Sequence, residues 1–126
     1  MNLTPYQIEI TESIYNSFIE VSGDRHQLHT DESYARSKGF NGKVVHGNLL
    51  NCFISYAIGV HLGIKDVLII NQTINFRNPC YLGDSLLLDL GIVSELDFLP
   101  GLEIAFKFTR DTTKIADGKI LIKTAL

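Results

Sequence analysis

One long apolar helix followed by strand-like segments constrains the fold of this chain more than any other feature. Residues 47 to about 61 form the expected helix, which Gly63 closes. Its apolar residues cover most of the circumference, and a helix of that kind is usually buried. These residues are Leu49, Leu50, Phe53, Ile54, Tyr56, Ala57 and Val60. The helix therefore needs a large apolar partner surface.

The second half of the chain can supply that surface as a sheet. Strands are expected at residues 67–76, 86–94, 103–112 and 119–124. They are separated by turn signals at Asn78-Pro79, Gly83-Asp84, Pro100-Gly101 and Asp117-Gly118. Within 103–110, Ile104, Phe106 and Phe108 alternate with polar or small residues, which is typical of a sheet with one buried face. The sequence predicts an α+β fold with an antiparallel sheet wrapped around a long central helix.

The first half contains shorter elements. A strand is expected at 6–10, then a helix capped by Thr11 and ending near Val21 at the Ser22-Gly23 turn. Thr30 is the expected cap of a second short helix that ends before Gly39. With no internal repeat or linker, residues 1–126 are predicted to form a single domain.

Composition excludes several classes of protein. The net charge of −3 and the scattered Lys and Arg residues argue against nucleic-acid binding, which needs clustered positive charge. No apolar run approaches the roughly 20 residues that span a bilayer, and the N-terminus does not resemble a signal peptide. We therefore expect no membrane association and a cytoplasmic location. Cys52 and Cys80 have no partner at metal-ligand spacing, so free thiols and no metal are expected.

Two loops carry residues suited to acid–base chemistry on a carbonyl compound. Asp24 follows the first turn, and His29 follows five residues later. An imidazole can give or take a proton near neutral pH, and a carboxylate can share that task. Gly47 opens the long helix, where unpaired backbone amides favour a developing negative charge. Taken alone, each feature also fits a solvated or capping residue.

Polar residues form a stripe along the otherwise apolar helix. At about 100° per residue, Gly47, Asn48, Asn51 and Ser55 project within one quadrant. One interpretation is that these polar groups form hydrogen bonds with neighbouring backbone or with a partner subunit. The other is that they face the same cavity as Asp24 and His29. His46, which precedes the helix, either orients substrate or water or holds its loop by hydrogen bonds.

Three blocks of sequence resemble one enzyme family. The run FIEVSGDRHQLHTDESYA, from Phe18 to Ala35, is similar to the hydratase signature of the MaoC-like, (R)-specific enoyl-CoA hydratase family. The segment from Gly39 to Leu50 resembles the second block of that family. Asn75-Phe76-Arg77-Asn78-Pro79 with Gly83-Asp84 resembles the third. Order and spacing are kept over most of the chain.

The resemblance implies a hotdog fold and a hydro-lyase that reversibly hydrates the 2,3 double bond of an enoyl thioester. It assigns Asp24 and His29 as catalytic, the Gly47 amide as the oxyanion contact, and Ser55 as a residue lining the site. The substrate carries CoA or acyl carrier protein, no cofactor is required, and the assembly is a homodimer. One departure concerns the loop, because His26-Gln27 replaces the usual Asn-Pro and removes a rigid proline and an amide side chain.

Two other functions share this fold. A hotdog thioesterase would activate water against the thioester carbonyl, but it does not explain the ordered Asp24 and His29 pair. A non-catalytic dimer would keep the pocket for acyl-thioester binding. Release of free thiol identifies the first, and ligand-dependent stabilisation without hydration identifies the second.

Overall fold

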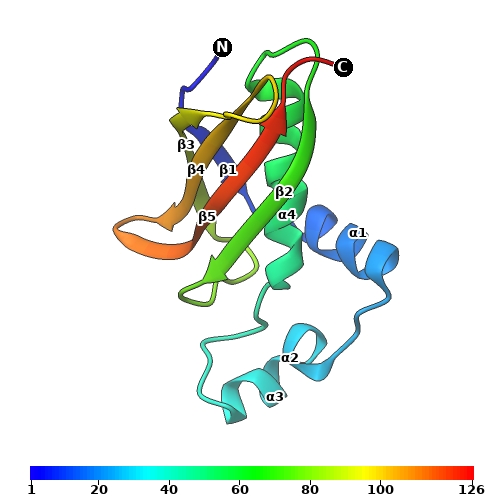
Figure 1. The fold of residues 1–126 in the computed structure, drawn as a ribbon. Helices are drawn as coiled ribbons and strands as arrows, with labels where there is room; N and C mark the ends of the chain where they lie inside the picture. The colour runs from blue at the N-terminus through cyan, green and yellow to red at the C-terminus, as the bar shows by residue number, and fades with distance from the viewer.

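The computed structural model describes all 126 residues and shows a curved antiparallel sheet wrapped around one helix (Figure 1). The five strands lie in the order β1-β3-β4-β5-β2, and each neighbouring pair is antiparallel. The strands are β1 (Tyr6–Glu9), β2 (Leu68–Phe76), β3 (Ser85–Glu95), β4 (Gly101–Arg110) and β5 (Thr113–Lys123). The predicted α+β architecture is confirmed.

The central helix is α4 (Gly47–Tyr56), which continues into the π-helical turn η1 (Ala57–His61). Leu50, Ile54 and Ile58 on its inner face pack against the sheet. Ile104, Phe106 and Phe108 point inward from β4, as their alternation predicts. The helix packs against the sheet as expected, but in the single chain only one side of it is buried. Several residues on the other side are exposed, namely Cys52, Ser55, Tyr56, Gly59 and Val60.

Helix α1 (Glu12–Ser22) begins and ends as its sequence predicts. The Thr11 hydroxyl accepts a hydrogen bond from the Ile14 amide at 3.2 Å. Gly23 ends the helix in the left-handed conformation with φ of 71°, which glycine adopts without steric cost. Its buried side chain Tyr15 joins the core beside α4.

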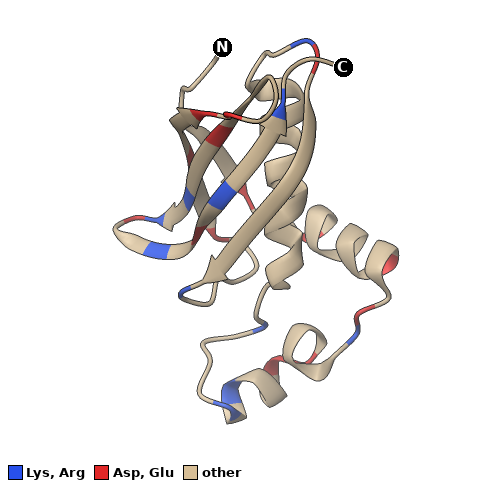
Figure 2. Cartoon of the chain, viewed as in Figure 1, with Lys and Arg blue, Asp and Glu red and all other residues tan.

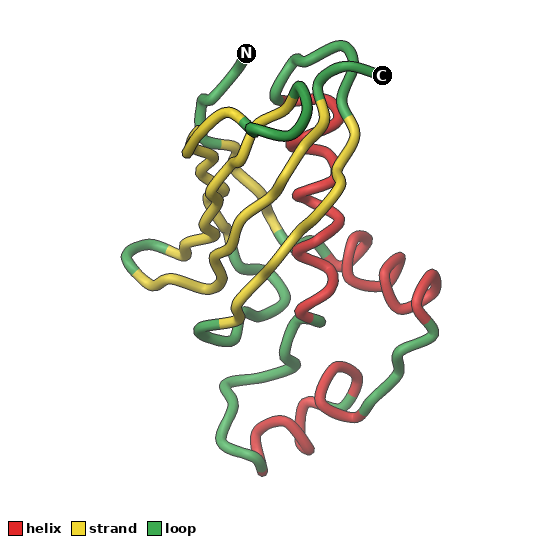
Figure 3. The backbone as a smooth tube through the Cα atoms, in the orientation of Figure 1, coloured by secondary structure: helices red, strands yellow, loops and turns green.

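The segment between α1 and α4 extends away from the sheet and contains two short helices, α2 (Gln27–Thr30) and α3 (Glu32–Ser37) (Figure 3). We expected one helix capped by Thr30, and this is wrong. The Asp31 carboxylate accepts from the Tyr34 amide at 3.0 Å and is the N-cap of α3. Thr30 instead ends α2, where its hydroxyl lies within hydrogen-bond distance of the Arg25 and His26 carbonyls.

The boundary between β4 and β5 also differs from the sequence prediction. Asp117-Gly118 does not form a turn but lies inside β5, opposite Lys107 and Phe106 of β4. The chain reverses near Asp111, which has a φ of 52°.

Acidic and basic residues are interspersed along the ribbon (Figure 2). None of the helices combines the length and apolarity that crossing a bilayer requires.

Candidate functional site

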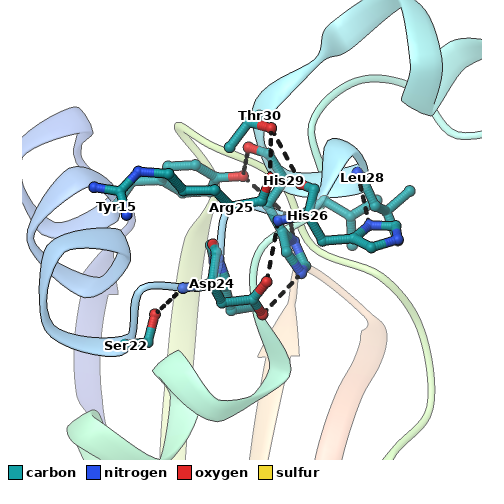
Figure 4. Close-up of polar contacts among 10 residues, drawn as sticks. Tyr15, Ser22, Asp24, Arg25, His26, Leu28, His29 and Thr30 are labelled. Carbon is teal, nitrogen blue, oxygen red and sulfur yellow. Dashed lines mark hydrogen bonds and ion pairs between the residues drawn. The ribbon is translucent and has the colours of Figure 1, made fainter.

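Asp24 lies in the loop between α1 and α2, where local hydrogen bonds fix its backbone (Figure 4). Its amide donates to the Ser22 hydroxyl at 3.1 Å, and its Oδ1 accepts from the His26 amide at 3.1 Å. The His26 amide, and secondarily the imidazole of His29, lower the pKa of the Asp24 carboxyl. The group is therefore a carboxylate at neutral pH, and its half-exposed side chain is accessible to a ligand.

His29 lies on α2 with its ring directed at Asp24 (Figure 4). Its Nδ1 lies 2.6 Å from the Val44 carbonyl oxygen, and because a carbonyl only accepts, Nδ1 carries a proton. Its Nε2 lies 3.6 Å from Oδ2 of Asp24. The backbone thus holds His29 in the orientation that directs Nε2 at the carboxylate.

The 3.6 Å separation between these two atoms has a chemical use. It is too long for a direct hydrogen bond, yet short enough for both atoms to contact a single water molecule. The pair can therefore bind one water and exchange protons with it, as an acid–base pair must.

The altered loop residue His26 takes a defined structural role. Its Nδ1 accepts from the Leu28 amide at 3.0 Å, which makes the imidazole the N-cap of α2. The backbone amide of His26 also donates a hydrogen bond to Asp24. Hydrogen bonds therefore fix the loop on both sides of His26, although the loop has no proline. Gln27 is simply the first residue of α2.

Gly47 and Asn48 are the first two residues of α4, and their backbone amides have no hydrogen-bond acceptor within the protein. The first amide of this helix with a protein acceptor is that of Leu49, which donates to the His46 carbonyl at 3.0 Å. The glycine leaves room for the ring of Phe76, because a Cβ on Gly47 would lie 2.8 Å from Cε1 of Phe76 and the ring would have to move. The helix start thus offers two donors to an anionic oxygen.

These groups border a cavity of about 530 Å³ between the end of the sheet and the α2–α3 segment. His29 and Gly47 both line it, so the structure brings one member of the acid–base pair and the helix start to the same space. The cavity is lined by His29, Val44, Val45, Gly47, Asn48, Leu50, Phe76, Arg77, Asn78, Pro79, Cys80 and Ile115. Its volume lies within the range of small-molecule binding sites.

Asp24 adjoins this cavity only through His29, and the remaining candidate residues do not line it. His46 is buried behind His29. Asn51 bonds with two side chains, accepting from Gln72 at 2.5 Å and donating to Asn48 at 3.1 Å. Ser55 is exposed on α4, about 12 Å along the helix from Gly47. In the single chain the polar stripe therefore reaches the cavity only through Gly47 and Asn48.

Asp24, His29 and His46 each offer a potential metal-ligating atom within 4.8 Å of the others. The two imidazole rings, however, are stacked with their planes 22° apart. Lone pairs of imidazole lie in the ring plane, so stacked rings do not aim them at a common point. One nitrogen of each ring is also bonded to a backbone carbonyl. The cluster is built for hydrogen bonding.

Sequence reasoning did not identify the role of Tyr15, a buried residue of α1. Its hydroxyl donates to the His29 carbonyl at 2.6 Å and lies 3.1 Å from the Val44 carbonyl. Burial raises the pKa of Tyr15 to about 12, so the hydroxyl remains a donor. The available signal was a tyrosine among aliphatic residues, because a buried phenol needs a polar partner.

The two thiols should react very differently. Cys52 is exposed, whereas Cys80 is buried at the cavity wall, and burial raises the pKa of its thiol to about 12. Because the thiolate is the reactive form, we expect one rapidly reacting thiol in the native protein and two in denaturant, measured with a chromogenic disulfide reagent. Cys52→Ser should remove the rapid phase, and rapid labelling of that variant would contradict the buried position of Cys80.

Comparison with known proteins places this geometry in context. A family model described as a MaoC-like domain matches residues 2–95. An (R)-specific enoyl-CoA hydratase from Rhodospirillum rubrum is 30% identical over 117 residues, covering 90% of this chain and 75% of the relative. A 3-hydroxybutyryl-CoA dehydratase from Methylorubrum extorquens is 28% identical over 115 residues, covering 91% and 73%.

A solved structure shares the whole architecture. The unliganded R-hydratase PhaJ1 from Pseudomonas aeruginosa superposes with a TM-score of 0.86 at 30% identity, covering 96% of this chain and 78% of that one. The fold predicted from the resemblance, an antiparallel hotdog sheet around a central helix, is thereby confirmed.

Proposed function

The chain belongs to the MaoC-like domain family, and on that basis we propose that it reversibly hydrates the 2,3 double bond of an enoyl thioester to the (R)-3-hydroxyacyl thioester. The observation that carries the proposal is the separation of 3.6 Å between His29 Nε2 and Asp24 Oδ2, beside a cavity that the Gly47 amide also borders. The names of the relatives, which are hydratases and dehydratases, support the same reaction class.

In the proposed reaction, Asp24 and His29 hold one water between them. The water oxygen forms a bond to C3 while the pair removes one of its protons, and a proton is delivered to C2. The thioester carbonyl gains enolate character meanwhile, and the Gly47 amide donates a hydrogen bond to its oxygen. Dehydration follows the same steps in reverse. Asn51 and Ser55 stay outside these steps, because neither lines the cavity of the single chain and neither bonds to Asp24 or His29.

The substrate class follows from this chemistry. A thioester is required, because its carbonyl accepts the negative charge that forms at C2, and we propose CoA or acyl carrier protein as the carrier. No redox step occurs, so the reaction needs no cofactor. The cytoplasm remains the compartment predicted from the sequence.

The test is the loss of enoyl-thioester absorbance when purified protein meets crotonyl-CoA, with chiral analysis of the product. We expect the (R)-3-hydroxy product and its disappearance in His29→Ala. If crotonyl-CoA is not used, longer enoyl-CoA and enoyl-carrier-protein substrates follow, and inactivity towards all of them would contradict the proposal. Free thiol released without a hydroxyacyl product would instead identify a thioesterase.

We further propose a homodimer, for which the exposed apolar surface is the support. Strand β2 is an edge of the sheet, and Leu68, Ile70 and Phe76 on it are exposed. An unpaired edge with apolar side chains favours pairing with another chain. Light scattering should give twice the 14.1 kDa chain mass, and a monomer at micromolar concentration would contradict the dimer.

A further inference from the structure

His46 is a buried histidine that lies directly behind the catalytic pair. Only 2% of it is exposed, and it does not line the cavity, so a bound substrate cannot reach it. It nevertheless contacts both Asp24 and His29. A buried imidazole with two such neighbours calls for a physical account, because burying a polar ring is costly unless its nitrogens are bonded.

The first contact is a hydrogen bond to the backbone of Asp24. Nε2 of His46 lies 2.9 Å from the Asp24 carbonyl oxygen. A carbonyl only accepts, so Nε2 carries the proton and donates it. The bond ties the α1–α2 loop to the residue just before α4 and holds the peptide on which the catalytic carboxylate is mounted.

The second contact is a ring stack on His29. The two imidazole centroids lie 3.7 Å apart with the planes tilted by 22°. Phe18 and Tyr15 contact the His46 ring at centroid distances of 5.0 and 5.6 Å. His46 is thus wedged between α1 and His29, and its ring forms a wall that stops the catalytic imidazole from swinging away from Asp24.

The remaining nitrogen of His46 fixes its charge. Nδ1 is buried and has no hydrogen-bond partner. The titratable groups that face the ring are Tyr15 from α1, Asp24 from the loop and His29 from α2. Burial, reinforced by His29, lowers the pKa of His46, while Asp24 opposes this shift. A second proton would leave a charged donor buried without an acceptor, so the ring is neutral.

We propose that His46 is a positioning residue that holds Asp24 by a hydrogen bond and His29 by stacking, and that it transfers no proton itself. This inference rests on the proposed hydratase function. Loosening either contact would let the 3.6 Å gap between the catalytic atoms vary. A misplacement of about 1 Å can lower a rate by about 10²-fold, so the effect should fall on kcat rather than on KM.

Two substitutions separate the two contacts. His46→Phe keeps a ring to stack on His29 but has no donor for the Asp24 carbonyl. His46→Gln keeps an N–H donor at the corresponding distance along the side chain but has no ring. Each should lower kcat by about 10- to 100-fold with KM changed less than about twofold. Full kcat in both folded variants would overturn the proposal.

His61 provides matched controls. Its Nε2 donates to the Thr4 carbonyl at 2.7 Å, and its ring lies 5.4 Å from that of Tyr6. His61→Phe and His61→Gln therefore remove the same kinds of contact at the far end of the helix and should leave kcat unchanged. Circular dichroism and thermal unfolding identify any variant that fails to fold.

Nitrogen-15 NMR of histidine-labelled wild-type protein tests the proposal without any substitution. The signals of the His46 ring are assigned as those that are absent from the spectrum of a folded His46→Gln or His46→Phe variant. We expect this ring to remain in the neutral form with the proton on Nε2 across the pH range of activity. Titration of His46 together with kcat/KM would make it a proton-transfer group and overturn the proposal. If the wild-type protein is inactive on every enoyl thioester, the proposed function is contradicted instead. The NMR spectrum would still show whether Nε2 of His46 carries the proton that it donates to the Asp24 carbonyl.

Discussion

Asp24→Asn is expected to lower kcat for hydration by about 10³-fold while leaving the fold unchanged. The amide keeps an oxygen that can accept from the His26 amide, as Oδ1 of the carboxylate does at 3.1 Å. It loses the negative charge and the basicity that a water between Asp24 and His29 requires. The measurement is kcat on an enoyl thioester that wild-type protein uses, together with the unfolding temperature.

Asp66→Asn is the matched control for this substitution. Asp66 is exposed in the loop before β2 and makes no ion pair or side-chain hydrogen bond. The Asp66→Asn substitution removes the same charge at a position outside the candidate site, so the kcat of this variant should equal that of the wild type. An Asp24→Asn protein with more than about a tenth of wild-type kcat would remove Asp24 from the acid–base step.

Gly118→Ala is expected to destabilise the fold by at least about 3 kcal/mol. A Cβ at position 118 would lie 1.9 Å from the backbone oxygen of Thr73 in β2, and 2.8 Å from Cζ of Phe106 in β4. Backbone cannot yield as a flexible side chain can, so β5 would have to separate from β2. Urea unfolding followed by circular dichroism measures the loss.

Gly91→Ala supplies the comparison. Gly91 lies within β3, opposite Ala105 of β4, and a Cβ there would meet nothing within 4 Å. Alanine reduces the freedom of the unfolded chain, so this variant should be as stable as the wild type or slightly more stable. Equal stability of the Gly118→Ala and Gly91→Ala proteins would show that β5 and β2 are not packed as closely as the structure indicates.

Gly118 also shows why the strand prediction failed where it did. From sequence, Asp117-Gly118 has the composition of a turn, because both residues are common there. The structure uses this glycine for close approach between strands, a requirement that arises only from the neighbouring chain. Asp111, which makes the actual turn, lies in the run Arg110-Asp111-Thr112 without a glycine.

The elements with strong local signals were predictable. Thr11 and Gly23 define α1 by their own chemistry, and the alternation in β4 identifies its buried face. The cap of α3 was misplaced by one residue because Thr30 and Asp31 are both good N-caps, and only the folded loop decides between them.

The proximity of Asp24 and His29 could be predicted from the sequence, whereas the groups that hold the two side chains in place could not. Asp24 and His29 were found by chemistry and by family resemblance, and the structure brings them together. The carbonyl of Val44, which orients His29, has no sequence signature, since every residue has a carbonyl. Helical spacing grouped Asn51 with Asn48, and their side chains are hydrogen-bonded, but it could not show that Gln72 of β2 would also bond with Asn51.

The imidazole cap of α2 ties two neighbouring segments together through one residue. His26 accepts from the Leu28 amide through Nδ1 at 3.0 Å, and its own amide donates to Oδ1 of Asp24 at 3.1 Å. The start of the four-residue helix that carries His29 and the loop that carries Asp24 are therefore joined at His26. A proline limits its backbone covalently, whereas here the start of α2 depends on a side-chain hydrogen bond that a substitution at residue 26 can remove.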